Sequence, residues 1–241
     1  MNGYDKNSPD SIRQMFDSIA RQYDRTNAIL SFSMHKLWNK TLIDRAIKPN
    51  QPKVLLDLCC GTGAIAFTYL ANEERPATAY MLDFSEGMLA CAKVNGDRPA
   101  LQKHDIHYLQ ADAQAVPLTA ESVDCASIAY GIRNIKDPSK CFKEVIRVLK
   151  PGGVFGILEL TQPSNKILRA GHHFYLKNIL PIIGKLAASN EEAYKYLCNS
   201  INSFTPPDVL AAMLMDRGFK NVQRHPLMGG IATVFTAQKS N

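Results

Sequence analysis

The chain has 241 residues, 46% of them hydrophobic and 21% charged, which is typical of a folded globular domain and excludes a disordered protein. Its net charge of +6 would suit nucleic acid, an anionic membrane surface or an anionic substrate, and the scattered basic residues select none of them. The sequence has no apolar run of the roughly 18 residues that cross a bilayer, no recognisable signal peptide and no CxxC pair among its six cysteines. We therefore expect a cytoplasmic protein with reduced thiols.

The first fifty residues have the apolar spacing of helices. Ser8 followed by Pro9 is typical of a helix start. The segment 23–27 interrupts the helical pattern, which resumes afterwards and ends before Pro49. We expect residues 1–50 to form a helical lid.

Strands alternating with helices follow this lid. Apolar runs predict strands at 54–58, 78–82, 106–109, 123–130 and 154–160, and helical patterns lie at 64–70, 85–92 and 137–149, with a polar loop at 95–104. This alternation is typical of βαβ units, so the sequence predicts an α/β, Rossmann-like fold whose sheet is mostly parallel, with helices on both faces.

The last eighty residues depart from this alternation. Helical patterns cover 166–188, with a kink at Pro181, then 191–203 and 205–218, and two strands follow at 220–225 and 231–238. The expected sheet therefore has seven strands, with a helical insertion before the last two, in a single domain that covers residues 1–241.

A glycine turn joins the first strand to its helix. It reads Asp57-Leu-Cys-Cys-Gly61-Thr62-Gly63, and glycines at this place let the backbone turn sharply and a ligand approach the helix N-terminus. Asp83 ends the second strand and Asp112, followed by Ala113, ends the third. Because ligands of open α/β sheets bind at the carboxyl ends of the strands, these acids form a candidate binding site.

Two ligands are compatible with this site. Gly61-x-Gly63-x-x-Ala66 with Asp83 matches the dinucleotide fingerprint, although that motif alone is weak. Asp57 discriminates, because a carboxylate beside the turn repels a pyrophosphate but offsets the sulfonium and ammonium charges of S-adenosylmethionine. In this interpretation Asp83 binds the ribose hydroxyls, Asp112 binds the adenine amino group, and S-adenosylmethionine is favoured over NAD.

The sequence resembles the C-methyltransferases of menaquinone and ubiquinone biosynthesis, the demethylmenaquinone methyltransferase type included. These are class I S-adenosylmethionine-dependent enzymes. The similarity extends from about residue 10 to 238 and is carried by Phe16-Asp-Ser-Ile-Ala20, Leu56-Asp-Leu-Cys-Cys-Gly-Thr-Gly63, Asp83-Phe-Ser85, Asp112-Ala113, Tyr130-Gly-Ile-Arg-Asn134 and Arg147-Val-Leu-Lys-Pro-Gly-Gly153.

This resemblance implies functions for particular residues. Cofactor contacts are expected from the turn and the strand ends, at Asp57, Gly61, Thr62, Gly63, Asp83, Asp112, Ala113 and Ala129. Residues 53–161 then form the cofactor-binding core, and 162–241 supply the substrate-side helices and the last strands. The chain departs from the family pattern at Asn39, Ala64, Ala129 and Gln162, where the family commonly has arginine, an acid, serine and lysine.

Three residues are expected beside the substrate ring. Methyl transfer to carbon needs a quinol that has lost a hydroxyl proton, and Arg133 would stabilise the resulting phenolate while Asn134 and Tyr23 orient the ring oxygens. A structural salt bridge is the alternative for Arg133, and core packing is the alternative for Tyr23.

The resemblance implies a polyprenyl naphthoquinol as substrate, methylated from demethylmenaquinol to menaquinol. The alternative is a 2-polyprenyl-6-methoxy-benzoquinol of ubiquinone biosynthesis. A nucleic-acid methyltransferase is more distant, because base-acting enzymes often carry Asn/Asp-Pro-Pro-Tyr after the fourth strand, where this chain reads Ala-Tyr-Gly-Ile-Arg. We therefore expect no nucleic-acid partner.

The remaining features are the histidines and one amphipathic stretch. His104 with His107, and His172 with His173, lack the further ligands of a metal site, so we expect no metal. Residues 174–186 are amphipathic. They predict either packing, on the sheet or on a second copy in a homodimer, or peripheral contact with the inner face of a membrane, where a polyprenyl tail would enter.

Overall fold

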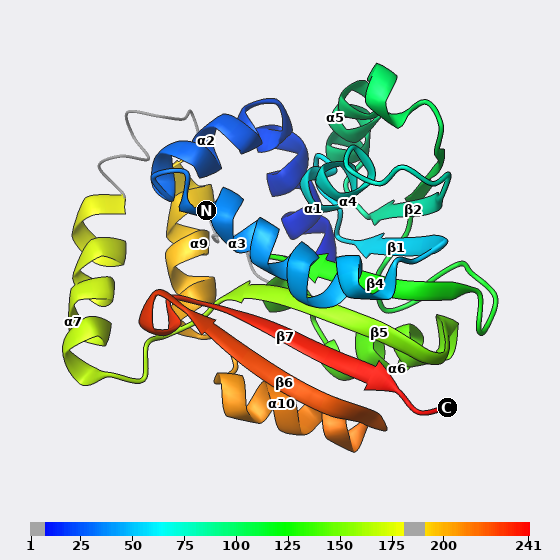
Figure 1. The fold of residues 1–241 in the computed structure, drawn as a ribbon. Helices are drawn as coiled ribbons and strands as arrows, with labels where there is room; N and C mark the ends of the chain where they lie inside the picture. The colour runs from blue at the N-terminus through cyan, green and yellow to red at the C-terminus, as the bar shows by residue number, and fades with distance from the viewer. Residues whose placement is uncertain (1–7, 181–190) are drawn as a thin grey trace.

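The computed structural model describes residues 8–180 and 191–241. Within them the chain forms one seven-stranded sheet flanked by helices (Figure 1). The strands are β1 (Val54–Leu58), β2 (Thr78–Asp83), β3 (Asp105–Gln110), β4 (Val123–Ala129), β5 (Leu149–Leu160), β6 (Phe219–Leu227) and β7 (Ala232–Lys239).

The strand order in the sheet is β3-β2-β1-β4-β5-β7-β6. Strands β1 to β5 run parallel, whereas β7 is antiparallel to both of its neighbours, β5 and β6. The antiparallel pair arises because only the short turn Met228–Gly230 joins β6 to β7, and a turn of that length cannot make a parallel crossover. The predicted mostly parallel, seven-stranded sheet is therefore confirmed.

Side chains from the two faces of the sheet enter separate cores. On β1, Leu55 packs with α3, α4 and α5, whereas Leu56 and Leu58 pack on the opposite face with α6 and α10. This alternation follows from the two-residue period of a strand. The helices are α3 (Met34–Leu42), α4 (Ala64–Leu70), α5 (Glu86–Gly96), α6 (Pro138–Val148) and α10 (Pro207–Asp216).

The lid differs from the expected pattern at one point. Segment 23–27, expected as a break, lies inside helix α2 (Tyr23–Leu30), which follows α1 (Pro9–Ile19) after one 3₁₀ turn. The actual break falls at Phe32 and Ser33, which both have positive φ angles, 49° and 61°. The sequence did not indicate α2 as a helix, because most of its side chains are polar and only Leu30 is buried in a core.

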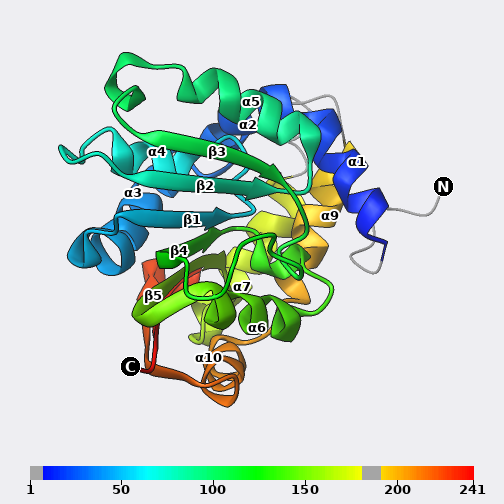
Figure 2. The same ribbon diagram turned by 90° about the vertical axis from the view of Figure 1, so that its right-hand side faces the viewer.

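The helices between β5 and α10 lie beyond the carboxyl ends of the parallel strands (Figure 1, Figure 2). Strands β2 and β3 point toward α1 and α9 (Glu191–Asn202) (Figure 2). The expected helix 166–188 begins as α7 (Lys166–Phe174) and continues as a π-turn, Tyr175–Ile179. Its end, with the predicted kink at Pro181, lies outside the described residues.

Two boundaries also differ from the expectation. Half of the predicted loop 95–104 is helical, because α5 extends to Gly96 and a 3₁₀ turn covers Pro99–Leu101. Strand β5 begins at Leu149, where the sequence predicts a helix end and a turn before residue 154. None of the helices in the described ranges is both long enough and apolar enough to span a bilayer.

Candidate active site

The glycine turn between β1 and α4 has the backbone that only glycine allows. Gly61 and Gly63 have φ angles of +55° and +88°, and Cys59 adopts +50°. A Cβ atom on Gly63 would lie 2.1 Å from the Phe67 ring, so any side chain here would have to displace that ring and would strain the backbone. The Gly61 N–H donates to Asp83 Oδ2 at 2.9 Å, which fastens the turn to the end of β2.

Asp83 is a nearly buried carboxylate, 6% exposed. Its Oδ1 accepts a hydrogen bond from the Ser85 N–H at 2.9 Å, and Ser85 in turn caps α5 through Met88. Burial raises the pKa of Asp83 to about 6, although the backbone N–H groups of Ser85 and Gly61 oppose the shift. The ionised form of this carboxylate would be stabilised by a pair of hydroxyl groups that donates hydrogen bonds to it.

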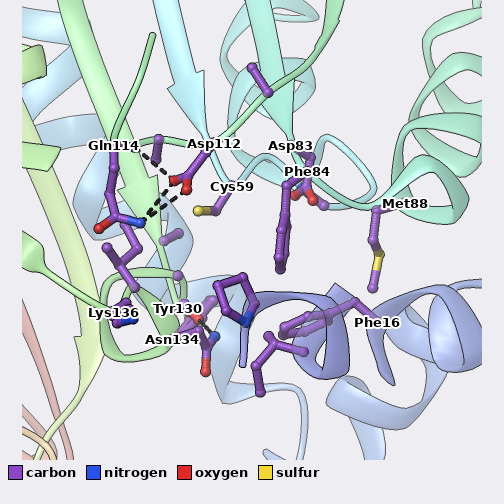
Figure 3. A pocket seen from close by; sticks show the side chains of 18 of the residues that line it. Phe16, Cys59, Asp83, Phe84, Met88, Asp112, Gln114, Tyr130, Asn134 and Lys136 are labelled. Carbon is purple, nitrogen blue, oxygen red and sulfur yellow. Dashed lines mark hydrogen bonds between the residues drawn. The ribbon is translucent and has the colours of Figure 1, made fainter. Parts of the chain in front are cut away.

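Asp112, at the end of β3, is an exposed acid held by its own loop. Its Oδ1 accepts from the Gln114 N–H at 2.8 Å, and the Gln114 amide also contacts both carboxylate oxygens. Figure 3 places Asp112, Asp83 and Cys59 around one pocket, with Phe84 between the second strand and the lid.

We name this the strand-end pocket. The space that it encloses, including the open solvent at its mouth, is about 730 Å³. Its floor contains the predicted Gly61, Asp83, Asp112, Ala113 and Ala129. Its other wall comes from the lid and from the loop after β4, and includes Pro9, Ile12, Phe16, Tyr23 and Asn134.

Other predicted residues lie beneath or beside this pocket and do not line it. Asp57 is 1% exposed and accepts hydrogen bonds from Ser127 Oγ at 2.8 Å and the Ala66 N–H at 3.4 Å. Burial raises its pKa to about 7. Thr62 donates to Asp24 Oδ1 of α2 at 2.7 Å, and Gly63 starts α4. These residues support the turn from below, because β1 directs Asp57 toward the α4 face.

Arg133 is buried in a hydrogen-bond network. Its NH1 nitrogen lies 2.7 Å from Glu159 Oε1, and its Nε lies 3.3 Å from Ser200 Oγ. Arg133 is 8% exposed and Glu159 is fully buried, so the pair is shielded from water. The interaction with Glu159 is the main influence that raises the pKa of Arg133 against desolvation, and the guanidinium stays charged. The structural salt bridge considered for Arg133 is therefore present, and its side chain also lines two cavities.

Asn134 has a fixed orientation. Its Oδ1 accepts a hydrogen bond from the Tyr196 hydroxyl of α9 at 2.9 Å, and its Nδ2 donates to the Tyr130 carbonyl at 3.2 Å. The loop after β4 therefore depends on α9 for both Arg133 and Asn134.

Tyr23 stands where three cavities meet. It lines the strand-end pocket and two further cavities. A lid cavity lies between α1, α2 and α9, with about 640 Å³ of space including its mouth. An apolar cavity, with about 690 Å³ including its mouth, lies between α2, α3 and residues 166–180, which we call the α7 segment. Burial raises the pKa of its phenol, and Arg133 opposes that rise. Tyr23, Asn134 and Arg133, predicted beside one ring, are thus brought together around this junction.

Several contacts of the site were not predicted from the sequence. Glu159, Ser200 and Tyr196 hold the Arg133–Asn134 loop, and Asp17 of α1 accepts from Ser85 Oγ at 2.6 Å. The sequence did contain a signal for Glu159, because it is a charged residue inside an otherwise apolar strand. Ser127 is likewise a polar residue inside an apolar strand. The other partners belong to helices whose docking no local pattern specifies.

His104 and His107, which are close in the sequence, have separate partners in the structure. His104 is buried, and its ring contacts the Leu70 carbonyl at 2.9 Å and the Ala77 N–H at 3.2 Å. His107 is exposed and pairs with Asp105 at 2.8 Å. No cluster of three potential metal ligands occurs in residues 8–180 and 191–241.

Solved structures share this fold at low sequence identity. The [4+2]-cyclase SpnF aligns with a TM-score of 0.68 over 95% of both chains at 14% identity. A SAM-dependent methyltransferase from Aquifex aeolicus aligns with a TM-score of 0.54 over 77% of this chain and 81% of its own, at 18% identity. These similarities establish the Rossmann-like architecture and nothing finer.

Sequence relatives are much closer. A demethylmenaquinone methyltransferase of Protochlamydia amoebophila is 48% identical over 99% of both chains, and one of Chlamydia caviae is 39% identical over 97% of both. Residues 4–239 match the family model described as the ubiE/COQ5 methyltransferase family. The resemblance drawn from the motifs is thus confirmed: the chain belongs to the ubiE/COQ5 methyltransferase family.

Proposed function

We propose that the protein transfers a methyl group from S-adenosylmethionine to a ring carbon of a demethylmenaquinol, forming menaquinol. The observation that carries this proposal is the position of Tyr23, where the strand-end pocket meets two cavities. A pocket that contains Asp83 and Asp112 for the donor thus adjoins apolar space for a long acceptor. The full-length similarity to demethylmenaquinone methyltransferases supports the naphthoquinol over the benzoquinol of ubiquinone biosynthesis.

The strand-end pocket has the groups that the donor needs. Asp83 would accept the two ribose hydroxyls, and Asp112 with Ala113 would hold the adenine. Asp57, buried under the turn, would offset the positive charge of the methionine end through Gly61 and Thr62. When bound, S-adenosylmethionine supplies an electrophilic methyl group whose leaving group is a neutral thioether.

The acceptor ring would lie against Tyr23 and the loop after β4. Arg133 is removed from water and its charge is balanced by Glu159, so its guanidinium would act on a developing phenolate oxygen by donating a hydrogen bond to it. Asn134 and Tyr23 would orient the ring, because Tyr196 already fixes the Asn134 amide. In this arrangement the lid helices within 9–50 close the site, 53–161 hold the donor, and 162–180 with 191–241 supply the acceptor side.

The apolar cavity suits the isoprenoid tail of the acceptor. Leu30, Leu176, Leu180 and Ile201 line it, and all four are buried. Tyr175 closes one side by donating from its hydroxyl to the Leu30 carbonyl at 2.6 Å. A tail in this cavity would run from Tyr23 toward the α7 segment.

We also propose that the protein meets its substrate at a membrane surface. Apolar side chains near this cavity are exposed: Phe32 by 71%, Leu37 by 56% and Phe174 by 59%. Phe32 contacts the ring of Tyr175, which joins the lid and the α7 segment into one face. Lys36 and Lys177 beside it would favour an anionic bilayer at its cytoplasmic leaflet.

Of the amphipathic stretch 174–186, only residues 174–180 are described, and Leu176 and Leu180 point into the cavity wall. A homodimer stays a prediction.

A methyl-transfer assay tests the proposed reaction. Purified protein is given deuterium-labelled S-adenosylmethionine with a short-chain demethylnaphthoquinol or a 6-methoxy-benzoquinol, under anaerobic conditions. The labelled methyl should appear mainly on the naphthoquinol, and Arg133→Lys should lower turnover at least tenfold with donor affinity unchanged. Methylation of neither quinol by a protein that binds the donor would contradict the proposal.

A further inference from the structure

His35, on helix α3, has a defined tautomer. Its Nδ1 lies 2.7 Å from Ser31 Oγ, and Ser31 Oγ donates its only hydrogen to the Asn27 carbonyl at 2.6 Å. With the hydroxyl hydrogen on the Asn27 carbonyl, the serine oxygen accepts from the ring, and this hydrogen-bond pattern assigns the imidazole hydrogen to Nδ1. Nε2 is left with a free lone pair, and His35 lines the apolar cavity.

Trp38 follows three residues later on the same face of α3 and lines the same cavity. It is 6% exposed, and its Nε1 is the one buried side-chain nitrogen or oxygen without a hydrogen-bond partner in residues 8–180 and 191–241. A buried N–H group without a partner costs roughly 1–3 kcal/mol, so such groups point to a missing partner. The cavity thus has an acceptor at His35 in its lining, and the unpartnered N–H of Trp38 lies buried behind the same wall, one turn away on α3.

This polar corner lies close to the reacting region. Tyr23 and Tyr130 line both the apolar cavity and the strand-end pocket, and Arg133 lines the apolar cavity with them. His172 is the other imidazole of the cavity, and Tyr175 is its remaining phenol. A ring that lies at Tyr23 would adjoin both the strand-end pocket and the cavity that His35 and Trp38 line.

We infer that His35 and Trp38 bind one hydroxyl oxygen of the quinol, and that His35 accepts the proton of that hydroxyl. This inference rests on the proposed function, since it names the proton acceptor of the same reaction. The quinol O–H bond breaks, a new N–H bond forms at His35 Nε2, and the electron pair stays on the oxygen. Trp38 donates to that oxygen, whose charge is delocalised onto the ring carbon that takes the methyl group. That carbon then loses its own hydrogen as a proton to solvent, and the oxygen regains its proton from His35, so one proton is released overall.

The protonation state of the imidazole supports this assignment. Burial and the charge of Lys36 lower the pKa of His35, whereas Asp24 opposes the shift. The charged and titratable groups facing it across the cavity are Arg133, Tyr23, Tyr130, His172 and Tyr175. At neutral pH the ring is uncharged and able to take a proton.

Two conservative variants separate the two roles. In His35→Gln the amide retains hydrogen-bonding reach but accepts no proton, and Trp38→Phe removes the N–H group alone. With saturating S-adenosylmethionine and a short-chain demethylnaphthoquinol, His35→Gln should lower kcat about a hundredfold or more at neutral pH. Its rate should rise with pH toward the wild-type value as the quinol ionises by itself.

Trp38→Phe should mainly raise KM, about tenfold, since it removes one hydrogen bond to the acceptor. The exposed His107→Gln is the matched control.

The failure of this inference is distinguishable from that of the proposed function. If the wild-type protein does not methylate the quinol, the proposed function fails. If wild type is active and His35→Gln has the same kcat and pH profile, the inference is overturned.

The chain has one tryptophan, so a reading independent of turnover is also available. In a nitrogen-15 correlation spectrum the single indole resonance should move downfield when the demethylnaphthoquinol is added to protein without donor, as its N–H gains a partner. An indole resonance that stays in place while the quinol is bound and methylated would overturn the assignment of Trp38.

Discussion

Asp83 connects the sequence motif with the geometry of the strand-end pocket. Asp83→Ala removes the proposed acceptor of two ribose hydroxyls and should weaken S-adenosylmethionine binding by about 2 kcal/mol, roughly thirtyfold in Kd. Isothermal titration calorimetry measures this directly. Because Asp83 also accepts the Gly61 and Ser85 N–H groups, a thermal melt must accompany the titration. An unchanged Kd in a folded variant would remove Asp83 from the donor site, and Asp105→Ala, an exposed acid on β3, is the control.

The two buried acids make donor binding depend on pH. Burial raises the pKa of Asp57 to about 7 and that of Asp83 to about 6, so both are largely protonated in the free protein at about pH 5. Their native pKa values lie above the unfolded values, so the stability that they contribute is lost as pH rises through about 6 and 7. A cationic donor favours the ionised acids, and its affinity should therefore increase between about pH 5 and pH 8.

Calorimetric titrations across this pH range would check the sign. Asp57→Asn should flatten the pH dependence and should stabilise the free protein more at about pH 8 than at about pH 5. An affinity that falls with rising pH would mean that ionised Asp57 does not offset the positive end of the donor and that ionised Asp83 does not accept the ribose hydroxyls.

The residues of the site were predictable to different depths. Asp83 and Asp112 were identifiable because an acid that ends a parallel strand lies at the ligand-binding edge. The burial of Asp57 follows from strand alternation, but its bond with Ser127 on the neighbouring strand needs the register of the sheet. The Glu159–Arg133 pair joins residues 26 apart, and nothing local in the sequence specifies it.

At the scale of elements, the lid is fastened to the donor-binding loops by carboxylates. Asp17 of α1 accepts from Ser85 Oγ at 2.6 Å and from the Gly87 N–H at 2.9 Å, at the N-terminus of α5. Asp24 of α2 accepts from Thr62 in the glycine turn. The lid therefore interacts with both loops that would contact the donor.

Asp17→Ala should loosen α1 without disturbing the sheet. The loss of a carboxylate at a helix N-terminus costs about 1 kcal/mol, so amide hydrogens of residues 9–19 should exchange roughly fivefold faster in hydrogen-exchange mass spectrometry. Asp10→Ala on the same helix, which removes an exposed pair with Arg13, is the matched control. Equal exchange in the two variants would mean that other contacts hold the lid.

Element boundaries were least predictable where a helix faces a cavity. The strands and the helices α4 to α6 had apolar periodicity because their buried side chains pack in the two cores on the faces of the sheet. Helix α2 lacked that pattern, since Tyr23, Thr26 and Asn27 line a cavity and its other polar side chains are exposed. The helical break at Phe32 and Ser33 depends on two left-handed residues that are not glycines, and neither residue type signals it.

At the scale of the whole molecule, the donor pocket and the proposed membrane face are linked through the apolar cavity. Phe32→Ser with Phe174→Ser should reduce binding to anionic vesicles, because the two changes remove about 3 kcal/mol of apolar burial in a bilayer. Vesicle sedimentation measures this, and high salt should release the wild-type protein. Val94→Ser, which changes another exposed apolar residue on α5, is the control. Equal sedimentation of all variants would exclude this face.

Restoration of quinone methylation in cells is the most direct test of the central claim. The chain is expressed in a bacterial strain that cannot methylate demethylmenaquinone, and the extracted quinones are identified by mass spectrometry. The account predicts that menaquinone reappears with the wild-type chain, and that Asp83→Ala, expressed at the same level, leaves mostly the demethylated precursor. Continued accumulation of demethylmenaquinone in cells that contain the folded wild-type protein would contradict the account.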